Sequence, residues 1–147
     1  MKKIILLVLV ICLALGLGYY LNLDVVYYDY VYRGESESWT AQLVGEGEWT
    51  FRDKGDFTTA KTQGFYKMTI SYKGQLADLQ ALDQLNIFYD AGDMGGSELQ
   101  IEGGSIDEIQ FVFERFSGLK PGEKMDVVVT IQMDEKVEQF ILDEINQ

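Results

Sequence analysis

Residues 65–73, which read FYKMTISYK, decide the fold class. Their alternate positions Tyr66, Met68, Ile70 and Tyr72 are apolar or aromatic, and most positions between them are lysine, threonine or serine. This alternation is typical of a β-strand that buries one face against a core. The stretch therefore predicts a sheet with one buried and one solvated face, which is the usual form of an antiparallel sheet.

Similar patterns lie on both sides of this stretch. Further strands are expected over residues 24–33, 39–44, 48–52, 86–90, 98–102, 109–116, 124–133 and 137–142. Residues 124–133 are expected to form the longest strand and to pair with residues 137–142 through a turn at Asp134 and Glu135. Trp39 begins the alternation in residues 39–44, so we expect its side chain to lie in the core.

Glycine and polar residues predict the connections between these strands. Gly45 and Gly47 bracket Glu46 and indicate a turn, and the polar residues 53–63 indicate a loop. Leucine recurs every third residue in residues 75–85, which favours one or two helical turns across the end of the domain. Seven to nine short strands joined in this way predict an all-β fold, an antiparallel β-sandwich of the immunoglobulin type or similar. An up-and-down or partly open barrel is the alternative.

Residues 1–23 predict a transmembrane or signal helix. Lys2 and Lys3 precede residues 4–23, which carry no charge. As a helix rising about 1.5 Å per residue, this run reaches roughly 30 Å, the thickness of a bilayer core. It is either a retained signal anchor or a signal peptide, in which case residues 1–18 are removed and the rest is secreted. Because both lysines precede the apolar run, residues 24–147 are expected to lie outside the membrane as one domain.

The composition of the expected outer domain excludes several functions. Residues 24–147 contain ten basic and 24 acidic residues and carry a formal charge of −14. Phosphate backbones repel such a domain, so we expect no nucleic-acid partner and favour a basic envelope protein. The chain has no histidine, and its one cysteine, Cys12, lies in the apolar segment. This excludes histidine-based catalysis and most zinc sites, and we expect no cofactor and no catalytic residue.

One group of acidic residues is a candidate calcium site. Asp90, Asp93, Glu98 and Glu102 lie in or beside a glycine-rich stretch, and their oxygens are the ligands that calcium prefers. Their spacing does not fit the EF-hand loop, and the alternative is a solvated loop whose glycines serve turns.

A second candidate is the pair Glu35 and Glu37. The two acids fall on the same side of an extended chain just before Trp39, where they could form a ridge that faces a partner. The alternative is a polar edge that prevents edge-to-edge pairing of sheets.

Residues 32–39, which read YRGESESW, resemble the Y-x-G-E-S-E-x-W stretch of small uncharacterised envelope proteins of Bacillus-type Gram-positive bacteria. Residues 125–142 are similar to the hydrophobic hairpin that closes those proteins. The resemblance implies an extracytoplasmic β domain behind a signal or lipid anchor, and it implies no activity. Ile11 precedes Cys12 where a lipid anchor requires a small residue, so lipidation is not carried over.

These features predict a binding or interaction module of the cell envelope without catalytic activity. A calcium- or polysaccharide-binding module is the alternative, and a small hydrolase is a further one. An interaction module is expected to expose an apolar or aromatic patch on one sheet face. A calcium- or polysaccharide-binding module is expected to show converging oxygens or a shallow aromatic platform. An enzyme is expected to hold buried carboxylates with shifted pKa values in a cleft.

We expect a reporter enzyme fused after Gln147 to be active only outside the membrane, because both N-terminal lysines precede the apolar run. Protease added to intact protoplasts that carry the protein should degrade the domain. Full protection of the domain from that protease would contradict the predicted orientation.

Overall fold

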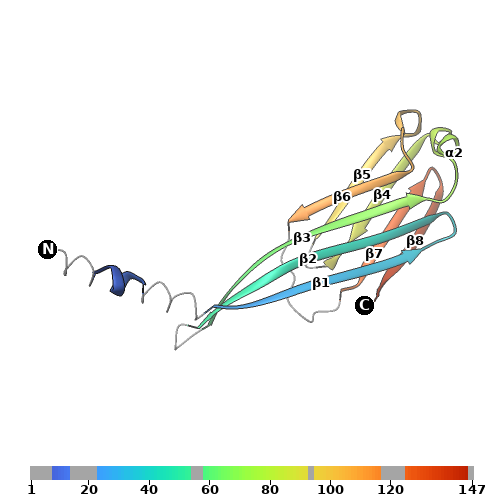
Figure 1. The fold of residues 1–147 in the computed structure, drawn as a ribbon. Coiled ribbons are helices and arrows are strands. Elements are labelled where there is room, and N and C mark those ends of the chain that lie inside the picture. The colour runs from blue at the N-terminus through green and yellow to red at the C-terminus, as the bar shows by residue number, and fades with distance from the viewer. Residues whose placement is uncertain (1–7, 14–22, 54–57, 93–94, 117–124, 146–147) are drawn as a thin grey trace.

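The structure is a computed structural model that describes residues 8–13, 23–53, 58–92, 95–116 and 125–145 (Figure 1). Its elements are β1 (Leu23–Glu35), β2 (Trp39–Asp53), β3 (Thr58–Tyr72), α2 (Leu76–Gln80), β4 (Gln84–Asp90), β5 (Gly96–Glu102), a 3-10 turn (Gly103–Ser105), β6 (Gln110–Phe116), β7 (Val127–Met133) and β8 (Lys136–Glu144). Helix α2 lies at one end of the sheet, as the leucine spacing in residues 75–85 predicts.

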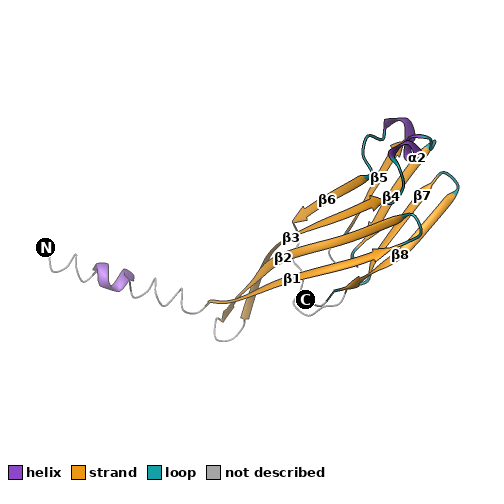
Figure 2. Ribbon diagram, turned by 45° about the vertical axis from the view of Figure 1, so that its right-hand side comes forward, coloured by secondary structure: helices purple, strands orange, loops and turns teal. Residues whose placement is uncertain are grey.

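All strands pair antiparallel, in the order β5-β4-β7-β8-β1-β2-β3-β6. The seam between β8 and β1 is short, because only Tyr32 with Glu144 and Arg33 with Asp143 pair across it. The two ends of the strand order approach each other, and the rings of Tyr89 on β4 and Phe113 on β6 lie 5.3 Å apart. The eight strands therefore form one sheet that curls into a nearly closed, barrel-like shape (Figure 2).

The predicted all-β, antiparallel class is confirmed, and the described strands fall within the predicted seven to nine. The division into the two sheets of a sandwich is not confirmed, and the curled sheet is closer to the partly open barrel. At the N-terminus, residues 8–13 are helical, and residues 1–7 and 14–22 of the predicted helix lie outside the described residues. Leu23, the last residue of the predicted helix, begins β1. Among the residues described, no helix has the length and apolar character to cross a bilayer.

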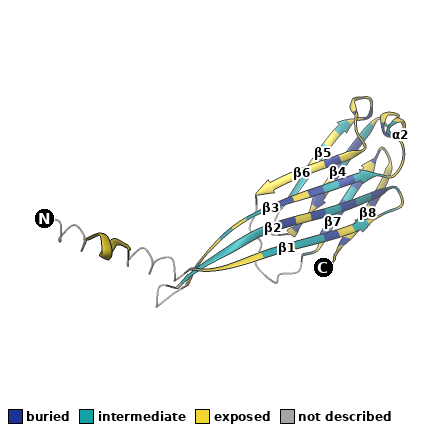
Figure 3. Ribbon diagram, in the orientation of Figure 1, coloured by how far each residue is buried: buried dark blue, intermediate teal, exposed yellow. Residues whose placement is uncertain are grey.

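One continuous core fills the barrel, where buried positions gather in the strands of the body (Figure 3). Inward and outward side chains alternate, as on β7, where Val127, Val129 and Ile131 are fully buried. The prediction for Trp39 is confirmed, since its side chain is fully buried. Its ring centroid lies 5.0 Å from that of Tyr72 and 6.1 Å from that of Phe111.

The predicted turn at Gly45 and Gly47 is wrong, because β2 runs unbroken from Trp39 to Asp53. Gly45 lies opposite Tyr30 and Gly47 lies opposite Tyr28 on the neighbouring strand β1. A Cβ atom on Gly45 would come within 2.0 Å of the Tyr30 ring, so the tyrosine occupies the space that the glycine leaves. These glycines therefore allow tyrosine side chains of β1 to approach the backbone of β2 closely, and they do not bend the strand.

The predicted loop over residues 53–63 is wrong over its second half, because β3 begins at Thr58. β2 and β3 contain 15 residues each, whereas β7, in the region expected to hold the longest strand, contains seven. The additional length forms a three-stranded ribbon of residues 23–31, 44–53 and 58–64, which extends beyond the ends of the other strands (Figure 1). Much of the ribbon lies away from the core, so its strands lack the apolar alternation that identifies a strand in a sequence.

We expect Trp39→Ala to lower the free energy of unfolding by about 3–5 kcal/mol, which is the usual cost of removing a large buried aromatic side chain. Chemical denaturation followed by circular dichroism measures this loss. Val137→Ala is the matched control, because Val137 is 58% exposed, and a surface substitution of this kind usually changes stability by less than about 0.5 kcal/mol. A loss below about 1 kcal/mol for Trp39→Ala would contradict its place in the core.

Candidate functional site

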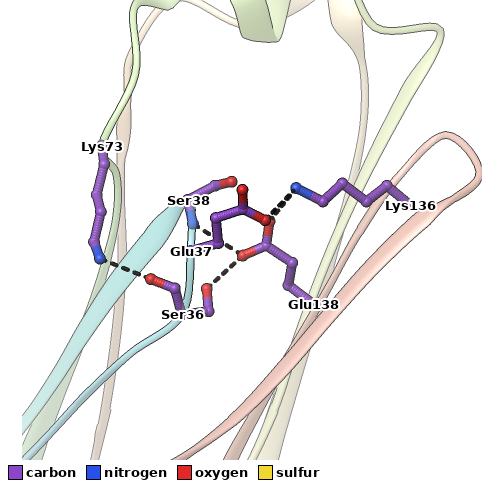
Figure 4. Close-up of polar contacts among 6 residues, drawn as sticks. All are labelled: Ser36, Glu37, Ser38, Lys73, Lys136 and Glu138. Atoms are coloured by element: carbon purple, nitrogen blue, oxygen red, sulfur yellow. Dashed lines mark hydrogen bonds and ion pairs between the residues drawn. The ribbon is translucent and has the colours of Figure 1, made fainter.

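The candidate residues Glu35 and Glu37 lie in the turn between β1 and β2. β1 ends at Glu35, β2 begins at Trp39, and the Ser36 backbone N–H donates a hydrogen bond to the Trp39 carbonyl at 2.9 Å. The predicted extended edge is therefore a tight hairpin turn. The turn is held from outside by residues of β8 and of the segment after β3 (Figure 4).

Glu138 on β8 is the centre of these contacts, and we call Ser36, Ser38, Lys136 and Glu138 the Glu138 cluster. Its carboxylate accepts hydrogen bonds from the Ser36 hydroxyl at 2.5 Å and from the Ser38 backbone N–H at 3.1 Å. Lys136 Nζ lies 2.8 Å from the other carboxylate oxygen, Oε1, which forms this ion pair but no hydrogen bond among the described residues. Glu138 is 8% exposed, the one buried charged residue in the described part of the chain.

The surroundings of Glu138 keep its carboxylate ionised. Burial opposes the charge, but Lys136 and the donors of Ser36 and Ser38 outweigh burial and lower the pKa of Glu138 to about 2. The nearby carboxylates of Glu138 and Glu37 raise the pKa of Lys136. A carboxylate with a lowered pKa cannot donate a proton near neutral pH, so Glu138 lacks the property of a general acid.

Glu35 and Glu37 each form an ion pair with a lysine. Lys73 Nζ lies 2.9 Å from Glu35 and donates a hydrogen bond to the Ser36 carbonyl at 2.7 Å, and Lys136 Nζ lies 3.2 Å from Glu37. Both carboxylates remain largely exposed, so their partner-facing role stays a prediction. Among the described residues, Glu35 has a lysine to itself, whereas Glu37 shares Lys136 with Glu138, and both ion pairs weaken the attraction of these acids for a basic partner.

Most residues of the Y-x-G-E-S-E-x-W stretch, residues 32–39, make contacts within the domain. Tyr32 and Trp39 are buried, and the serines hold Glu138. Gly34 lies at the seam, where an added Cβ would come within 2.5 Å of the Ile141 carbonyl oxygen. The residues of this stretch therefore join β1 and β2 to β8, which is a structural task.

The structure describes three of the four calcium candidates, and the calcium site stays a prediction. Asp90 Oδ1 accepts the Gly92 backbone N–H at 2.9 Å, as in a local turn. Glu98 and Glu102 are four residues apart on β5, which corresponds to about 13 Å along a strand. Asp93 lies outside the described residues. Within the described ranges no three cysteine or acidic side chains form a group that could hold a metal ion.

Sequence reasoning missed a groove on the outward face of β1, β2, β3 and β6. It has a volume of about 910 Å³ and is open along its length. The side chains that line its floor and walls from the outward face are Tyr27, Asp29, Glu46, Glu48, Gln63, Phe65 and Phe116. We call this the outer groove.

Strand register fixes the layout of the outer groove. One row across the sheet contains Asp29, Glu46, Phe65 and Phe116, which are direct cross-strand neighbours in that order. The Phe65 and Phe116 rings are tilted against each other with centroids 5.8 Å apart. Phe116 is 91% exposed, so an aromatic surface lies at one end of a row that has two acids at the other. The adjacent row begins with Tyr27 and Glu48.

The chemistry available in the outer groove is that of binding. Aromatic rings supply apolar contact area, and carboxylates beside them attract cations. The groove is wide and shallow, and none of its acids is buried. The sequence pattern does not reveal the outer groove, because nearly every position of residues 25–32 is apolar or aromatic. Outward and inward side chains of this segment can be distinguished only from the strand register.

We expect Glu138→Gln to lower the free energy of unfolding by about 1–3 kcal/mol at pH 7, because the amide cannot pair with Lys136. The pKa of Glu138 is lowered from 4.5 to about 2 on folding, so its ionisation stabilises the protein fully above pH 4.5. That stabilisation is lost as the pH falls through about 2. Urea denaturation at a series of pH values should therefore show the gap between the wild type and the variant shrinking across this window.

Glu37→Gln is the control, because Glu37 pairs with the same lysine but its side chain is 82% exposed. Its effect should stay within about 0.5 kcal/mol at every pH. A gap between Glu138→Gln and the wild type that does not change with pH would contradict the role given to the ionised carboxylate.

Comparison with known proteins does not place the chain in a family. No protein-family model, no curated protein and no solved structure matches it. The resemblance of residues 32–39 to envelope proteins therefore stays a prediction, and function is argued from the chain's own surfaces.

Proposed function

We propose that the chain is a binding module of the cell envelope that engages a partner protein through the outer groove. Residues 4–23 hold it at the outer side of the membrane, or it is secreted if residues 1–18 are removed. The resemblance of residues 32–39 to Gram-positive envelope proteins supports the same location. In this proposal the module carries out no catalysis.

The exposed aromatic surface of the outer groove carries the proposal. Phe116 is 91% exposed and Tyr27 is 76% exposed, although both are large side chains on a sheet that has a core to pack into. Phe65 contacts Phe116 and continues this surface toward the acids. Aromatic side chains exposed together in a concave site are a common feature of protein-binding surfaces, where burial on binding recovers the hydrophobic free energy.

Polysaccharide binding is the second candidate, and the shallow form of the outer groove favours it. Its aromatic rings could stack on sugar rings, and Gln63 and the acids could bond to hydroxyl groups. The acids repel the anionic polymers of a cell wall, so only a neutral or basic polysaccharide fits. The protein partner is preferred because the aromatic surface continues outward at Phe116 onto the edge strand β6.

The absence of catalysis is supported by the state of the acids. Glu138 is the one buried carboxylate in the described ranges, and its ion pair and hydrogen bonds occupy it within the fold. The acids of the outer groove are exposed or half-buried and lie in an open site. A hydrolase usually requires a carboxyl group whose pKa is raised toward the working pH, whereas the pKa of the buried Glu138 is lowered.

We expect a photo-crosslinking amino acid at position 116 of the full chain to form a defined adduct with a protein in intact cells of the native host. Position 137 on β8 is the matched control, because Val137 is also exposed but lies away from the outer groove. Adducts are compared by gel and identified by mass spectrometry. The proposal predicts an adduct at position 116 that is missing at position 137.

Equal adducts at both positions, or none at position 116, would contradict the groove as the binding surface. An adduct at position 116 that is removed by glycosidase and not by protease would favour the polysaccharide. Phe65→Ala in the crosslinking protein should reduce the adduct strongly, because its ring supports Phe116.

A further inference from the structure

We infer that the outer groove recognises cationic side chains, at alternate positions of an extended segment of the partner protein. The inference rests on the proposed function, because it names the chemistry that the same groove would bind. Three observations support the inference. The acids Asp29 and Glu46 are held side by side, no described ion pair reaches them or Glu48, and aromatic rings lie next to these acids.

Asp29 and Glu46 are direct cross-strand neighbours on the outward face. Side chains in such a pair start about 5 Å apart at their Cβ atoms, and two like charges there destabilise the sheet. Glu48 lies two residues further along β2 on the same face, about 7 Å from Glu46. Three negative charges are therefore held together at a cost to folding, and a cation bound among them would remove that cost.

Three other exposed acids of the chain form ion pairs with lysines. Glu35, Glu37 and Glu114 each have a lysine within ion-pair distance, at 2.9, 3.2 and 3.6 Å. Among the residues that the structure describes, no ion pair reaches Asp29, Glu46 or Glu48. These three acids are therefore available to a positive charge from outside the chain.

The aromatic side chains of the outer groove suit the same ligand. Phe65 is the direct neighbour of Glu46 across β2 and β3, and Tyr27 is the direct neighbour of Glu48 across β1 and β2. A lysine or arginine head that pairs with either acid would lie close to one of these rings, whose faces attract cations within about 6 Å. The apolar stem of the same side chain would cover the ring, since lysine and arginine carry three or four methylene groups.

The spacing of the acids points to an extended polypeptide. Glu46 and Glu48 repeat every second residue along a strand, about 7 Å apart. Side chains at alternate positions of an extended peptide point to the same side with the same spacing. Two basic residues with one residue between them therefore match both carboxylates.

The test uses the full chain in detergent micelles and a short labelled peptide that carries arginine at two alternate positions. A matched peptide carries citrulline at both positions, which keeps the shape and removes the charge. Binding is followed by fluorescence anisotropy at low and high salt. We expect the arginine peptide to bind at least about tenfold more tightly than the citrulline peptide, and its affinity to fall as salt rises.

Glu46→Gln combined with Glu48→Gln should weaken binding of the arginine peptide by about tenfold or more. Because the substitution removes repulsion, its melting temperature should be no lower than that of the wild type. Glu98→Gln combined with Glu102→Gln is the matched control: it makes the same change in net charge on exposed positions of β5. It should change the affinity by no more than about twofold.

Equal weakening by both double variants would overturn the inference, because the general field of the domain would then explain binding. Equal binding of the arginine and citrulline peptides would also overturn it. Failure of the arginine peptide to bind, with the adduct at position 116 present, would overturn the cationic ligand and leave the proposed binding surface standing. Binding of the arginine peptide without that adduct would count against the proposed function alone.

Discussion

The short seam between β8 and β1 is the constraint on which the rest of the structure depends. Only two residue pairs of the strands face each other there, and one further backbone hydrogen bond, from the Ile145 N–H to the Val31 carbonyl at 2.8 Å, lies beside them. Few backbone hydrogen bonds therefore hold the two halves of the sheet together. Gly34 lets β1 approach the backbone of β8, and the buried carboxylate of Glu138 binds Ser36 and Ser38 in the turn that follows. A buried charge is stable only when it is paired and hydrogen-bonded, and here both conditions are met. The Glu138 cluster therefore fixes where the β1–β2 hairpin lies relative to the rest of the barrel.

With one end of the hairpin fixed at the seam, the other end is free to extend as the ribbon. Tyr28 and Tyr30 lie over Gly47 and Gly45 and fill the space that the glycines leave, and β2 continues unbroken through both glycines. The unbroken β2 carries Glu46 and Glu48 onto the outward face beside residues of β1 and β3. The outer groove thus follows from pairing register and from tyrosine packing on the opposite face of the same strands.

Two groups of acids in this domain have different surroundings. Near the seam, Glu35 and Glu37 pair with lysines, and Glu138 is buried with an ion pair and hydrogen bonds that stabilise the fold. Asp29, Glu46 and Glu48 are held near one another beside aromatic rings, and no described lysine or arginine pairs with them. Local conflict of this kind is expected at a functional site, because the rest of the fold pays for it. A strongly acidic composition favours basic partners in general, but only the position of the acids names a surface.

The sequence by itself determined the class of fold and part of its core. Alternation in residues 65–73 predicted a strand with the correct inward face, residues 124–133 were correctly predicted to contain a strand, and Trp39 was placed in the core correctly. These predictions succeed because a half-buried strand must repeat every second residue. The same rule failed for residues 45–47 and 58–63, where the strands lie in the ribbon and burial no longer imposes a pattern. Which acids are neighbours was decided by the tertiary structure alone. Asp29 and Glu46, or Ser36 and Glu138, meet only once strand register and the seam are set, and no local pattern encodes a contact between residues so far apart in the chain.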